Sequence, residues 1–349
     1  MEKLKVGLIG YGMSGTVFHG PLISSNDKFE LAGIVTTNED RKKNIKIRYP
    51  KTKIYEGVDE LLDNKAITLV IIGTPNESHF TIAKKALLND KNVILEKPMT
   101  ITTKAADELI QLSREKNKML TVYHNRRLDS DFLTVKALIK NKKLGEVKQF
   151  ISYFDRFAPE APKHKWRYKN APGSGVLYDL GSHLIDQALV LFGKPTELFA
   201  DLRKERKNSE TIDAFHLILF YNGFRVILNS SFMVKGKKLR FQINGTKGTF
   251  KKYGLDVQEE HLSMGETPKD KGQWGLEPRR LWGELNTIET YQKVESEKGN
   301  YPYFYDNVYA HLVKKEPLLV KPEEARNVIR VIELAYKSCE EKSVIKVTF

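Results

Sequence analysis

The stretch that decides the fold is Leu4-Lys5-Val6-Gly7-Leu8-Ile9-Gly10-Tyr11-Gly12-Met13-Ser14-Gly15. Its first half is an apolar run about one strand long, and its second half has the form G-x-G-x-x-G. In such a turn the first glycine permits a tight bend, the second lets a pyrophosphate approach the backbone, and the third allows a helix to pack on the strand. The helix that follows would offer free N–H groups to phosphates. A plain tight turn is the alternative, but the position after a first strand favours dinucleotide binding by residues 10–15.

Strand-like and helix-like patterns alternate through the first third of the chain. Apolar runs indicate further strands, and spacings of three and four residues indicate helices between them. The expected strands are 4–9, 29–35, 67–73, 92–95 and 119–123, with helical patterns at 82–87 and 105–112. Strands separated by helices of this length are typical of βαβ units and a parallel sheet. The sequence therefore predicts an α/β fold with an N-terminal doubly wound (Rossmann) sheet over residues 1–123.

The pattern changes after Tyr123, because several strands then follow one another with little helix between them. Asn222-Gly223 joins two of these runs and is a strong hairpin signal. The expected elements are helices 131–140, 176–192 and 323–341, and strands 147–157, 197–202, 214–221, 224–232 and 239–243, with a loop at 159–175. We expect a C-terminal α+β domain over residues 124–349, built on a large, mostly antiparallel sheet.

Composition narrows the class of protein. The 349 residues carry 58 Lys and Arg against 44 Asp and Glu, a formal charge of +14, which raises the question of an anionic partner. The basic residues are dispersed, and no zinc finger, basic zipper or RNP-like stretch is present, so we expect no nucleic-acid partner. No apolar run approaches the ~20 residues of a membrane helix, and the apolar run at the N-terminus is shorter than that of a signal sequence, so we expect neither segment. The single Cys339 excludes an intramolecular disulfide and favours a reducing compartment, so we expect a cytoplasmic protein. The eight histidines show no tight metal-ligand cluster, and we expect no metal.

The end of the second expected strand bears on the choice between NAD and NADP. NAD sites commonly place an acidic residue about 20 residues after the glycines, where it binds the ribose 2′-hydroxyl. Here Thr36 and Thr37 stand at that tip, and Arg41 follows shortly after. Hydroxyls beside a guanidinium suit a 2′-phosphate. The sequence favours NADP as the cofactor, and NAD is the second choice. If Arg41 binds no cofactor, it is simply a solvated basic residue at the start of a helix.

Two more turns follow expected parallel strands, where ligands of such sheets bind. The first holds Thr74, Pro75 and Asn76, with His79 one helical turn later. An ordinary capped turn is the alternative, and for His79 the two interpretations are balanced. The second is Glu96-Lys97-Pro98, in which a lysine beyond a buried strand can donate to a substrate oxygen and stabilise negative charge there. Pro98 fixes the local backbone and can hold a cis bond.

The helix expected over 176–192 carries an aspartate and a histidine four residues apart. Asp179 and His183 should lie on one face, with Asp186 a turn further on. A carboxylate beside an imidazole orients it and suits it for proton transfer. Taken alone, such a pair is more often simple surface pairing.

Taken in order, these motifs resemble one family. The glycine turn, Glu96-Lys97-Pro98 and the run from Asp179 to Asp186 are similar to the motifs of the Gfo/Idh/MocA oxidoreductases, over almost the whole chain. The chain looks most like the NADP-dependent scyllo-inositol 2-dehydrogenase branch. The resemblance implies that Lys97, Asp179 and His183 form the reactive group. It also implies a polyol or sugar substrate, and a homodimer or homotetramer formed through the second domain's sheet.

The resemblance also suggests the remaining contacts. Asn125 and Glu96 are candidates for the cofactor, and Asp155, Trp166, Arg167 and Tyr178 for the substrate. One assignment has His183 accept the hydroxyl proton while Lys97 stabilises the oxygen. The other exchanges these two roles. The alternatives are a reductase of another keto-sugar or aldose, and a dinucleotide sensor without catalysis.

Overall fold

The computed structural model describes residues 3–162, 169–269 and 273–349. They form two compact units that are not continuous in sequence. The first unit comprises residues 1–125, 258–274 and 300–326, and the second comprises 126–257, 275–299 and 327–349. The domain boundary expected near residue 123 thus lies close to the first change of unit. Two later segments of the chain also return to the first unit.

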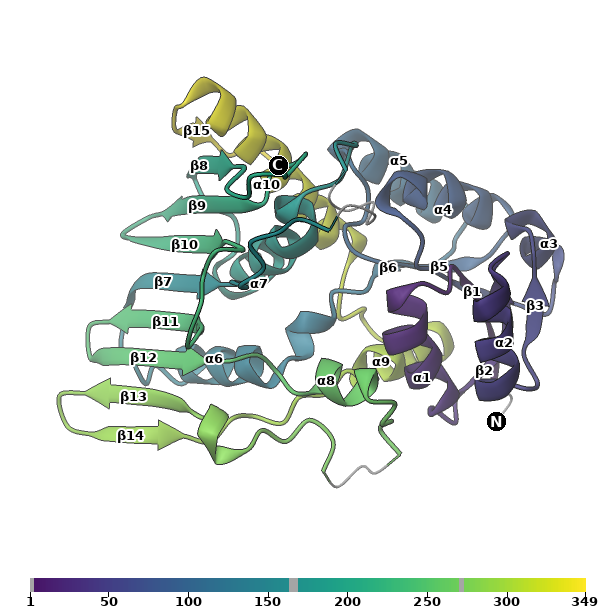
Figure 1. Cartoon of the computed structure of the whole chain (residues 1–349), viewed down its shortest axis with the longest axis horizontal. Helices are drawn as coiled ribbons and strands as arrows, with labels where there is room; N and C mark the ends of the chain where they lie inside the picture. The colour runs from purple at the N-terminus through teal and green to yellow at the C-terminus, as the bar shows by residue number, and fades with distance from the viewer. Residues whose placement is uncertain (1–2, 163–168, 270–272) are drawn as a thin grey trace. The chain divides into compact units, whose positions relative to one another are not determined.

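The first unit contains a parallel sheet in the order β3-β2-β1-β4-β5-β6 (Figure 1). The strands are β1 (Leu4–Ile9), β2 (Phe29–Val35), β3 (Lys53–Tyr55), β4 (Leu69–Ile72), β5 (Asn92–Leu95) and β6 (Leu120–Val122). Strand β4 is buried along its whole length, as expected for a strand covered on both faces. This is the predicted Rossmann sheet. Strand β3 was not predicted, because its three residues carry too short an apolar pattern.

Helices cover both faces of this sheet. Those from the first part of the chain are α1 (Gly20–Ser24), α2 (Glu39–Arg48), α3 (Val58–Asp63), α4 (His79–Leu88) and α5 (Thr103–Glu115). Short helices also occur at η1 (Ser14–His19), which is a π-helix, and at η2 (Asn76–Ser78). Helices α8 (Gln258–Ser263) and α9 (Pro302–Lys314) come from the later segments of the chain, and α9 contacts α1.

The second unit is built on a sheet in the order β14-β13-β12-β11-β7-β10-β9-β8-β15. Its strands are β7 (Val147–Tyr153), β8 (Glu197–Arg203), β9 (Ala214–Tyr221), β10 (Phe224–Ser230), β11 (Leu239–Gly245), β12 (Gly248–Tyr253), β13 (Gly283–Thr287), β14 (Tyr291–Val294) and β15 (Ile345–Lys346). All neighbouring strands pair antiparallel except β7 and β10. The large, mostly antiparallel sheet is therefore confirmed, and β9 and β10 form the predicted hairpin at Asn222-Gly223.

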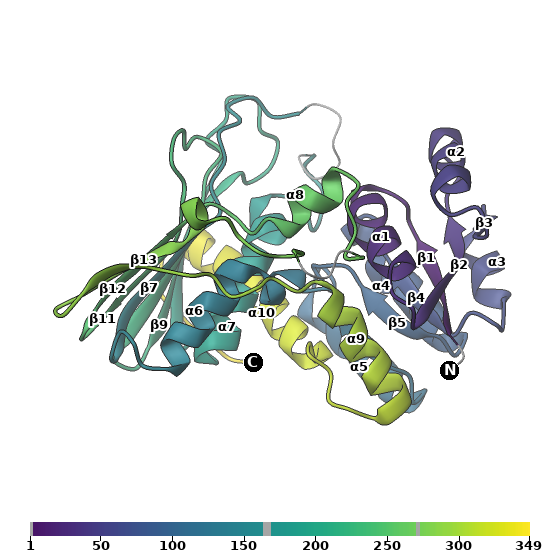
Figure 2. The same cartoon turned by 90° about the horizontal axis from the view of Figure 1, so that it is seen from below.

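Helices pack on one face of this second sheet only (Figure 2). They are α6 (Ser130–Lys140), α7 (Ser182–Phe192) and α10 (Pro322–Glu341). The single helix expected over 176–192 begins instead with a π-helical turn, η5 (Leu177–Gly181). Short helices also occur at η3 (Asn125–Leu128) and η6 (Arg279–Leu281). Among the described residues no helix is both long and apolar enough to cross a membrane.

Candidate active site

The glycine turn of the first unit has the geometry that a pyrophosphate requires. Gly10 has a φ of +97°, which side-chain-bearing residues rarely adopt, and a Cβ there would lie 2.7 Å from the Gly73 carbonyl oxygen. A Cβ on Gly15 would lie 2.6 Å from the Gly10 carbonyl oxygen. A Cβ on Gly12, in contrast, would meet no atom within 4 Å. The outer glycines are thus needed for packing, whereas the middle one leaves its backbone open to a ligand.

The side chains between these glycines differ in what they can offer a cofactor. Tyr11 is fully buried and its hydroxyl donates to Asn44 Oδ1 at 2.9 Å, so only its main chain can face a ligand. Met13 is half exposed, and Ser14 is partly exposed at the start of η1. The residues present therefore fit a bound dinucleotide phosphate.

The end of β2 carries hydroxyls and one unpaired cation. Thr36 is buried, its backbone N–H donates to the Tyr55 carbonyl oxygen at 3.0 Å, and Thr37 is exposed beside it. Asn38 caps α2 by accepting from the Arg41 N–H at 3.0 Å. Within the described part of the chain the Arg41 guanidinium makes no ion pair, whereas Lys42 binds the carboxylates of Glu39 and Glu56. Arg41 is the cation that remains available for a phosphate.

The turn after β4 is held by a buried histidine. The His79 ring is fully buried, with Nδ1 2.9 Å from the Pro98 carbonyl oxygen and Nε2 3.0 Å from the Thr74 carbonyl oxygen. Burial lowers the pKa of His79, so the ring is neutral near pH 7 and donates to one of these carbonyls. The geometry gives His79 a structural role between two turns. Contact with a cofactor stays a prediction for Thr74, Pro75 and Asn76.

Lys97 follows β5 and is half-buried, with a buried glutamate before it and a cis peptide bond to Pro98 after it. The Glu96 carboxylate accepts from the Lys97 backbone N–H at 3.0 Å and from His19 Nε2 at 3.0 Å. Both carboxylate oxygens of Glu96 are thus occupied within the protein. Burial alone would raise the pKa of Glu96, but its interactions with His19 and Lys97 together outweigh burial and lower it.

In the second unit, Asp179 and His183 lie on successive helical turns. Asp179 belongs to the π-helical turn η5 and is half-buried, and His183 stands in the first turn of α7 with 5% exposure. The His183 ring stacks over Phe154 with the ring centroids 6.5 Å apart. π-Helical turns often occur at functional sites, because the extra residue re-aims the side chains.

The remaining predicted substrate residues differ in their surroundings. The Tyr178 ring lies against Tyr336 at 6.0 Å, on the side of α10, and burial raises its pKa. Asp155 accepts from the Ser231 backbone N–H at 3.0 Å and lines a cavity of about 310 Å³ with Asp201, Glu205 and His216. A substrate contact by Asp155 stays a prediction. Trp166 and Arg167 lie outside the described residues.

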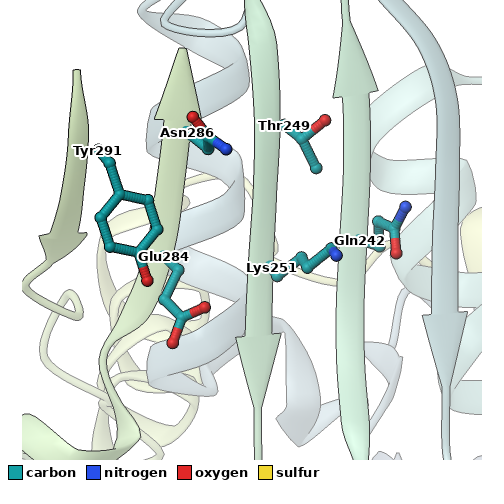
Figure 3. A pocket seen from close by; sticks show the side chains of 6 residues that line it. All are labelled: Gln242, Thr249, Lys251, Glu284, Asn286 and Tyr291. Atoms are coloured by element: carbon teal, nitrogen blue, oxygen red, sulfur yellow. The ribbon is translucent and has the colours of Figure 1, made fainter.

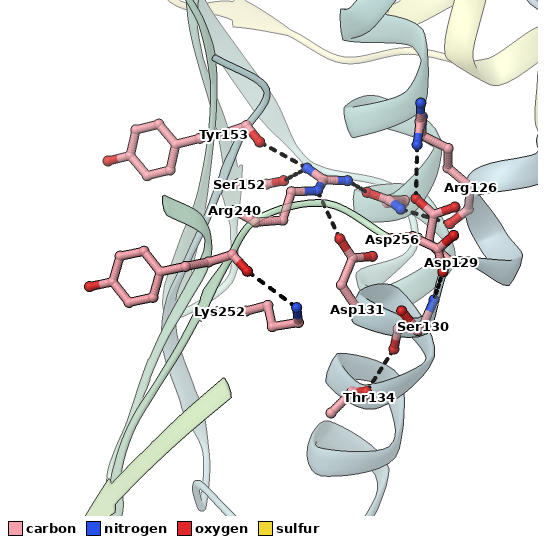
Figure 4. Close-up of polar contacts among 12 residues, drawn as sticks. Arg126, Asp129, Ser130, Asp131, Thr134, Ser152, Tyr153, Arg240, Lys252 and Asp256 are labelled. Atoms are coloured by element: carbon pink, nitrogen blue, oxygen red, sulfur yellow. Dashed lines mark hydrogen bonds and ion pairs between the residues drawn. The ribbon is translucent and has the colours of Figure 1, made fainter. Parts of the chain in front are cut away.

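A network of buried charges surrounds the His183 helix, and the sequence patterns gave no indication of it. Arg127 binds Asp186 through two hydrogen bonds, Nε to Oδ2 at 2.9 Å and Nη2 to Oδ1 at 2.6 Å. Arg240 is fully buried and donates to Asp131, Ser152 and Gln187 (Figure 4). The Gln187 amide in turn donates to the Arg126 carbonyl oxygen at 2.8 Å, which ties α7 to η3. Asn125, the other predicted cofactor contact, stands at the start of η3 with 5% exposure.

The fold and the glycine turn define a dinucleotide-binding protein with a second α/β unit. Residues 4–124 match the family model described as "Oxidoreductase family, NAD-binding Rossmann fold", and residues 136–348 match its C-terminal alpha/beta domain. The chain belongs to the Gfo/Idh/MocA oxidoreductase family.

Relatives and solved structures agree with this assignment. The chain is 38% identical to scyllo-inositol 2-dehydrogenase (NADP(+)) IolW of Bacillus subtilis, covering 99% of this chain and 96% of that protein. It is 24% identical to myo-inositol 2-dehydrogenase of Thermotoga maritima, with 98% of both covered. The solved oxidoreductase YvaA of Bacillus subtilis superposes with a TM-score of 0.95 at 37% identity, over 99% of both chains.

Proposed function

We propose that this oxidoreductase transfers a hydride between NADP(H) and a secondary alcohol or ketone of a polyol or sugar related to scyllo-inositol and inosose. The observation that carries the proposal is the full-length likeness to IolW, a relative named for scyllo-inositol and NADP(+). The open backbone at Gly12 supports a bound dinucleotide independently of that likeness.

Three side chains would carry the chemistry. The nicotinamide, when bound, accepts or returns the hydride. During oxidation the neutral His183 imidazole would accept the proton of the reacting hydroxyl, and the Lys97 ammonium would stabilise the negative charge that develops on that oxygen. Asp179 would orient His183 or bind a neighbouring hydroxyl.

The preference for NADP is argued from charge at the end of β2. That end offers hydroxyls and Arg41, but no carboxylate that would repel a 2′-phosphate at the strand tip itself. Arg41→Ala should weaken NADP⁺ binding by about tenfold or more, because a charge-assisted hydrogen bond is lost, and should leave NAD⁺ binding unchanged. Lys43→Ala is the matched control, since Lys43 is exposed in the same helix. Equal changes in the affinities for both cofactors would refute this assignment.

The central experiment is a screen of NADP⁺ and NAD⁺ against inositols, glucose and other sugars, followed by absorbance at 340 nm. Reduction of NADP⁺ with scyllo-inositol but not with glucose supports the proposal. Turnover of glucose or another aldose alone would favour the alternative sugar reductase. Cofactor binding without turnover of any substrate, measured by fluorescence titration, would favour a sensor.

The helix-free face of the second sheet supports a homo-oligomer, which we also propose. Four strands place one apolar residue each in a continuous row across it: Ile151, Ile227, Ile218 and Phe199. Beyond that row the same face carries polar side chains around a cavity of about 270 Å³, lined by Gln242, Thr249, Lys251, Glu284, Asn286 and Tyr291 (Figure 3). Ile218→Asp should lower the mass in sedimentation equilibrium if two copies pair through this face. The location that we propose is the cytoplasm, because the lone Cys339 suits a reducing compartment.

A further inference from the structure

A buried histidine of the first unit joins a distant tyrosine to the backbone of Lys97. His19 is fully buried, and its Nδ1 lies 2.6 Å from the hydroxyl of Tyr305, a residue of α9 that stands 286 positions later in the chain. Its Nε2 lies 3.0 Å from Glu96 Oε1. The other oxygen of Glu96 accepts from the Lys97 N–H at 3.0 Å. Four residues thus form one hydrogen-bonded chain that ends at the proposed catalytic lysine.

When the His19 ring is neutral and Glu96 is ionised, the chemistry of the partners fixes the direction of every hydrogen bond. An ionised carboxylate only accepts, so the ring proton of His19 must be on Nε2 to serve Glu96. Nδ1 then accepts from the Tyr305 hydroxyl, whose pKa burial raises well above its ordinary value, so that this hydroxyl stays protonated. A single tautomer satisfies all the partners. Glu96 thus selects this tautomer, and loss of the tyrosine hydroxyl would remove the donor that holds the His19 ring at Nδ1.

Aromatic rings enclose the chain and hold it away from water. The His19 ring lies 4.7 Å from that of Tyr123, which packs edge-on against Phe304 at 4.9 Å. Tyr305 is also fully buried and stacks edge-on against Phe29. In such surroundings a hydrogen bond is strong and its loss cannot be replaced by solvent. Packing alone therefore does not account for this arrangement.

We propose that Tyr305 and His19 are positioning residues for Lys97, and that they act through the Glu96 carboxylate. The inference rests on the proposed function, because it assigns Lys97 to the reacting oxygen. Tyr305 donates to Nδ1 and holds the His19 ring in place, His19 donates to one oxygen of Glu96, and the other oxygen of Glu96 accepts from the main chain of Lys97. The charged and titratable groups around Glu96 are His19, Lys97, His79 and Tyr305.

The test uses Tyr305→Phe, His19→Gln and His19→Leu in the full chain, with Tyr303→Phe as the matched control. Tyr303 is exposed in the same helix, so its hydroxyl is removed without touching the chain. Tyr305→Phe should lower kcat about two- to tenfold, the loss expected for one neutral hydrogen bond. His19→Leu should lower kcat about ten- to hundredfold, because a hydrogen bond to a carboxylate is lost. His19→Gln should recover part of that loss, since its amide can still donate to Glu96.

Two readouts separate positioning from simple packing. In Tyr305→Phe the acid limb of the kcat profile should move to higher pH, because Glu96 keeps its burial but loses part of its stabilisation. In ¹⁵N-histidine spectra the Nδ1 signal of His19, identified by its absence in His19→Gln, should shift, because Nδ1 loses its hydrogen-bond donor. A kcat in Tyr305→Phe equal to that of Tyr303→Phe, with an unchanged His19 signal, would overturn the proposal. Equal kcat values for His19→Gln and His19→Leu would also overturn it.

A third readout does not depend on catalysis. The backbone amide of Lys97 can be observed after ¹⁵N-lysine labelling and identified with Lys97→Arg. Tyr305→Phe should shift this signal, whereas Tyr303→Phe should leave it in place. If the wild-type chain turns over no substrate, the proposed function fails, and the Lys97 amide alone decides whether the hydrogen-bonded chain reaches it. An unshifted amide would then refute the positioning role.

Discussion

The two units support their proposed catalytic side chains in different ways. In the first, Lys97 follows a hydrogen-bonded chain of tyrosine and histidine that ends on Glu96. In the second, His183 stands on a helix held by the buried Arg127–Asp186 pair, and Arg240 donates to Gln187 of the same helix while it pairs with Asp131. Two further buried pairs of this unit are Arg206–Asp213 and Lys252–Glu277.

The difference has physical consequences. A buried ion pair does not change its protonation near neutral pH, but removal of one partner leaves a charge without compensation. The first unit instead contains the buried His79, whose pKa burial lowers, so that acid has to charge a buried ring. We therefore expect that substitution of one partner of a buried ion pair strongly lowers the stability of the second unit. We expect that acid lowers the stability of the first.

The largest effects on turnover should come from substitution of the two proposed catalytic side chains, Lys97 in the first unit and His183 in the second. Lys97→Ala and His183→Ala should each lower kcat by about 10²–10⁴-fold, because each removes a positioned acid, base or charge. Steady-state kinetics with the substrate found in the screen would measure this loss. Lys104→Ala, an exposed lysine of α5, is the control and should retain full activity. Near-normal turnover in either active-site variant would contradict its assigned role.

The buried pair under the His183 helix should give the next largest effect. Arg127→Met should lower the free energy of unfolding by about 3–5 kcal/mol, because it leaves Asp186 charged and buried without its partner. Asp186→Leu should cost a similar amount, whereas the double variant should recover much of the loss. Urea unfolding followed by circular dichroism measures the three values. Additive losses in the double variant would show that the pair has no coupling.

The sequence revealed the parts of this molecule that depend on local pattern. Strands β1 and β2 begin and end where predicted, because continuous apolar runs mark strands buried on both faces. Strand β12 was missed, because Lys252 points inward to form an ion pair with Glu277 and disguises the alternation of a strand. The short β13 and β14 were missed as well, since they bury little apolar surface.

The residues of the candidate site also differ in whether a local sequence pattern reveals them. Gly10, Gly12 and Gly15 could be found from spacing, because their roles follow from a single turn. Tyr305 could not be found, because nothing near it in sequence indicates a partner 286 residues away. Asp186 lies in a motif that was noticed, but only the fold shows that Arg127 faces it.

The pH dependence of stability should distinguish the two units. The pKa of His79 is lowered from 6.5 in the folded chain, so between its folded value and 6.5 the unfolded state binds more protons. Stability should therefore fall as the pH drops below about 6.5, by at most ~1.4 kcal/mol per pH unit from this group. His79→Gln should flatten this slope, and His311→Gln, altered at a half-buried position at the end of α9, should not. Urea titrations from pH 7 to 5 would measure the slopes, and equal slopes in all three proteins would contradict the assignment.

The smallest effect should come from an ion pair that only resembles those of the second unit. Arg326 binds Asp107 through two hydrogen bonds of 2.8 and 3.1 Å, a geometry close to that of Arg127 and Asp186. Asp107, however, is half exposed, and water therefore screens the attraction and can solvate whichever partner remains. Asp107→Asn should cost less than about 1 kcal/mol of unfolding free energy, and less still at high salt. If this substitution cost as much as Asp186→Leu, the geometry of the pair rather than its burial would set its importance, and the contrast between the two units would lose its physical basis.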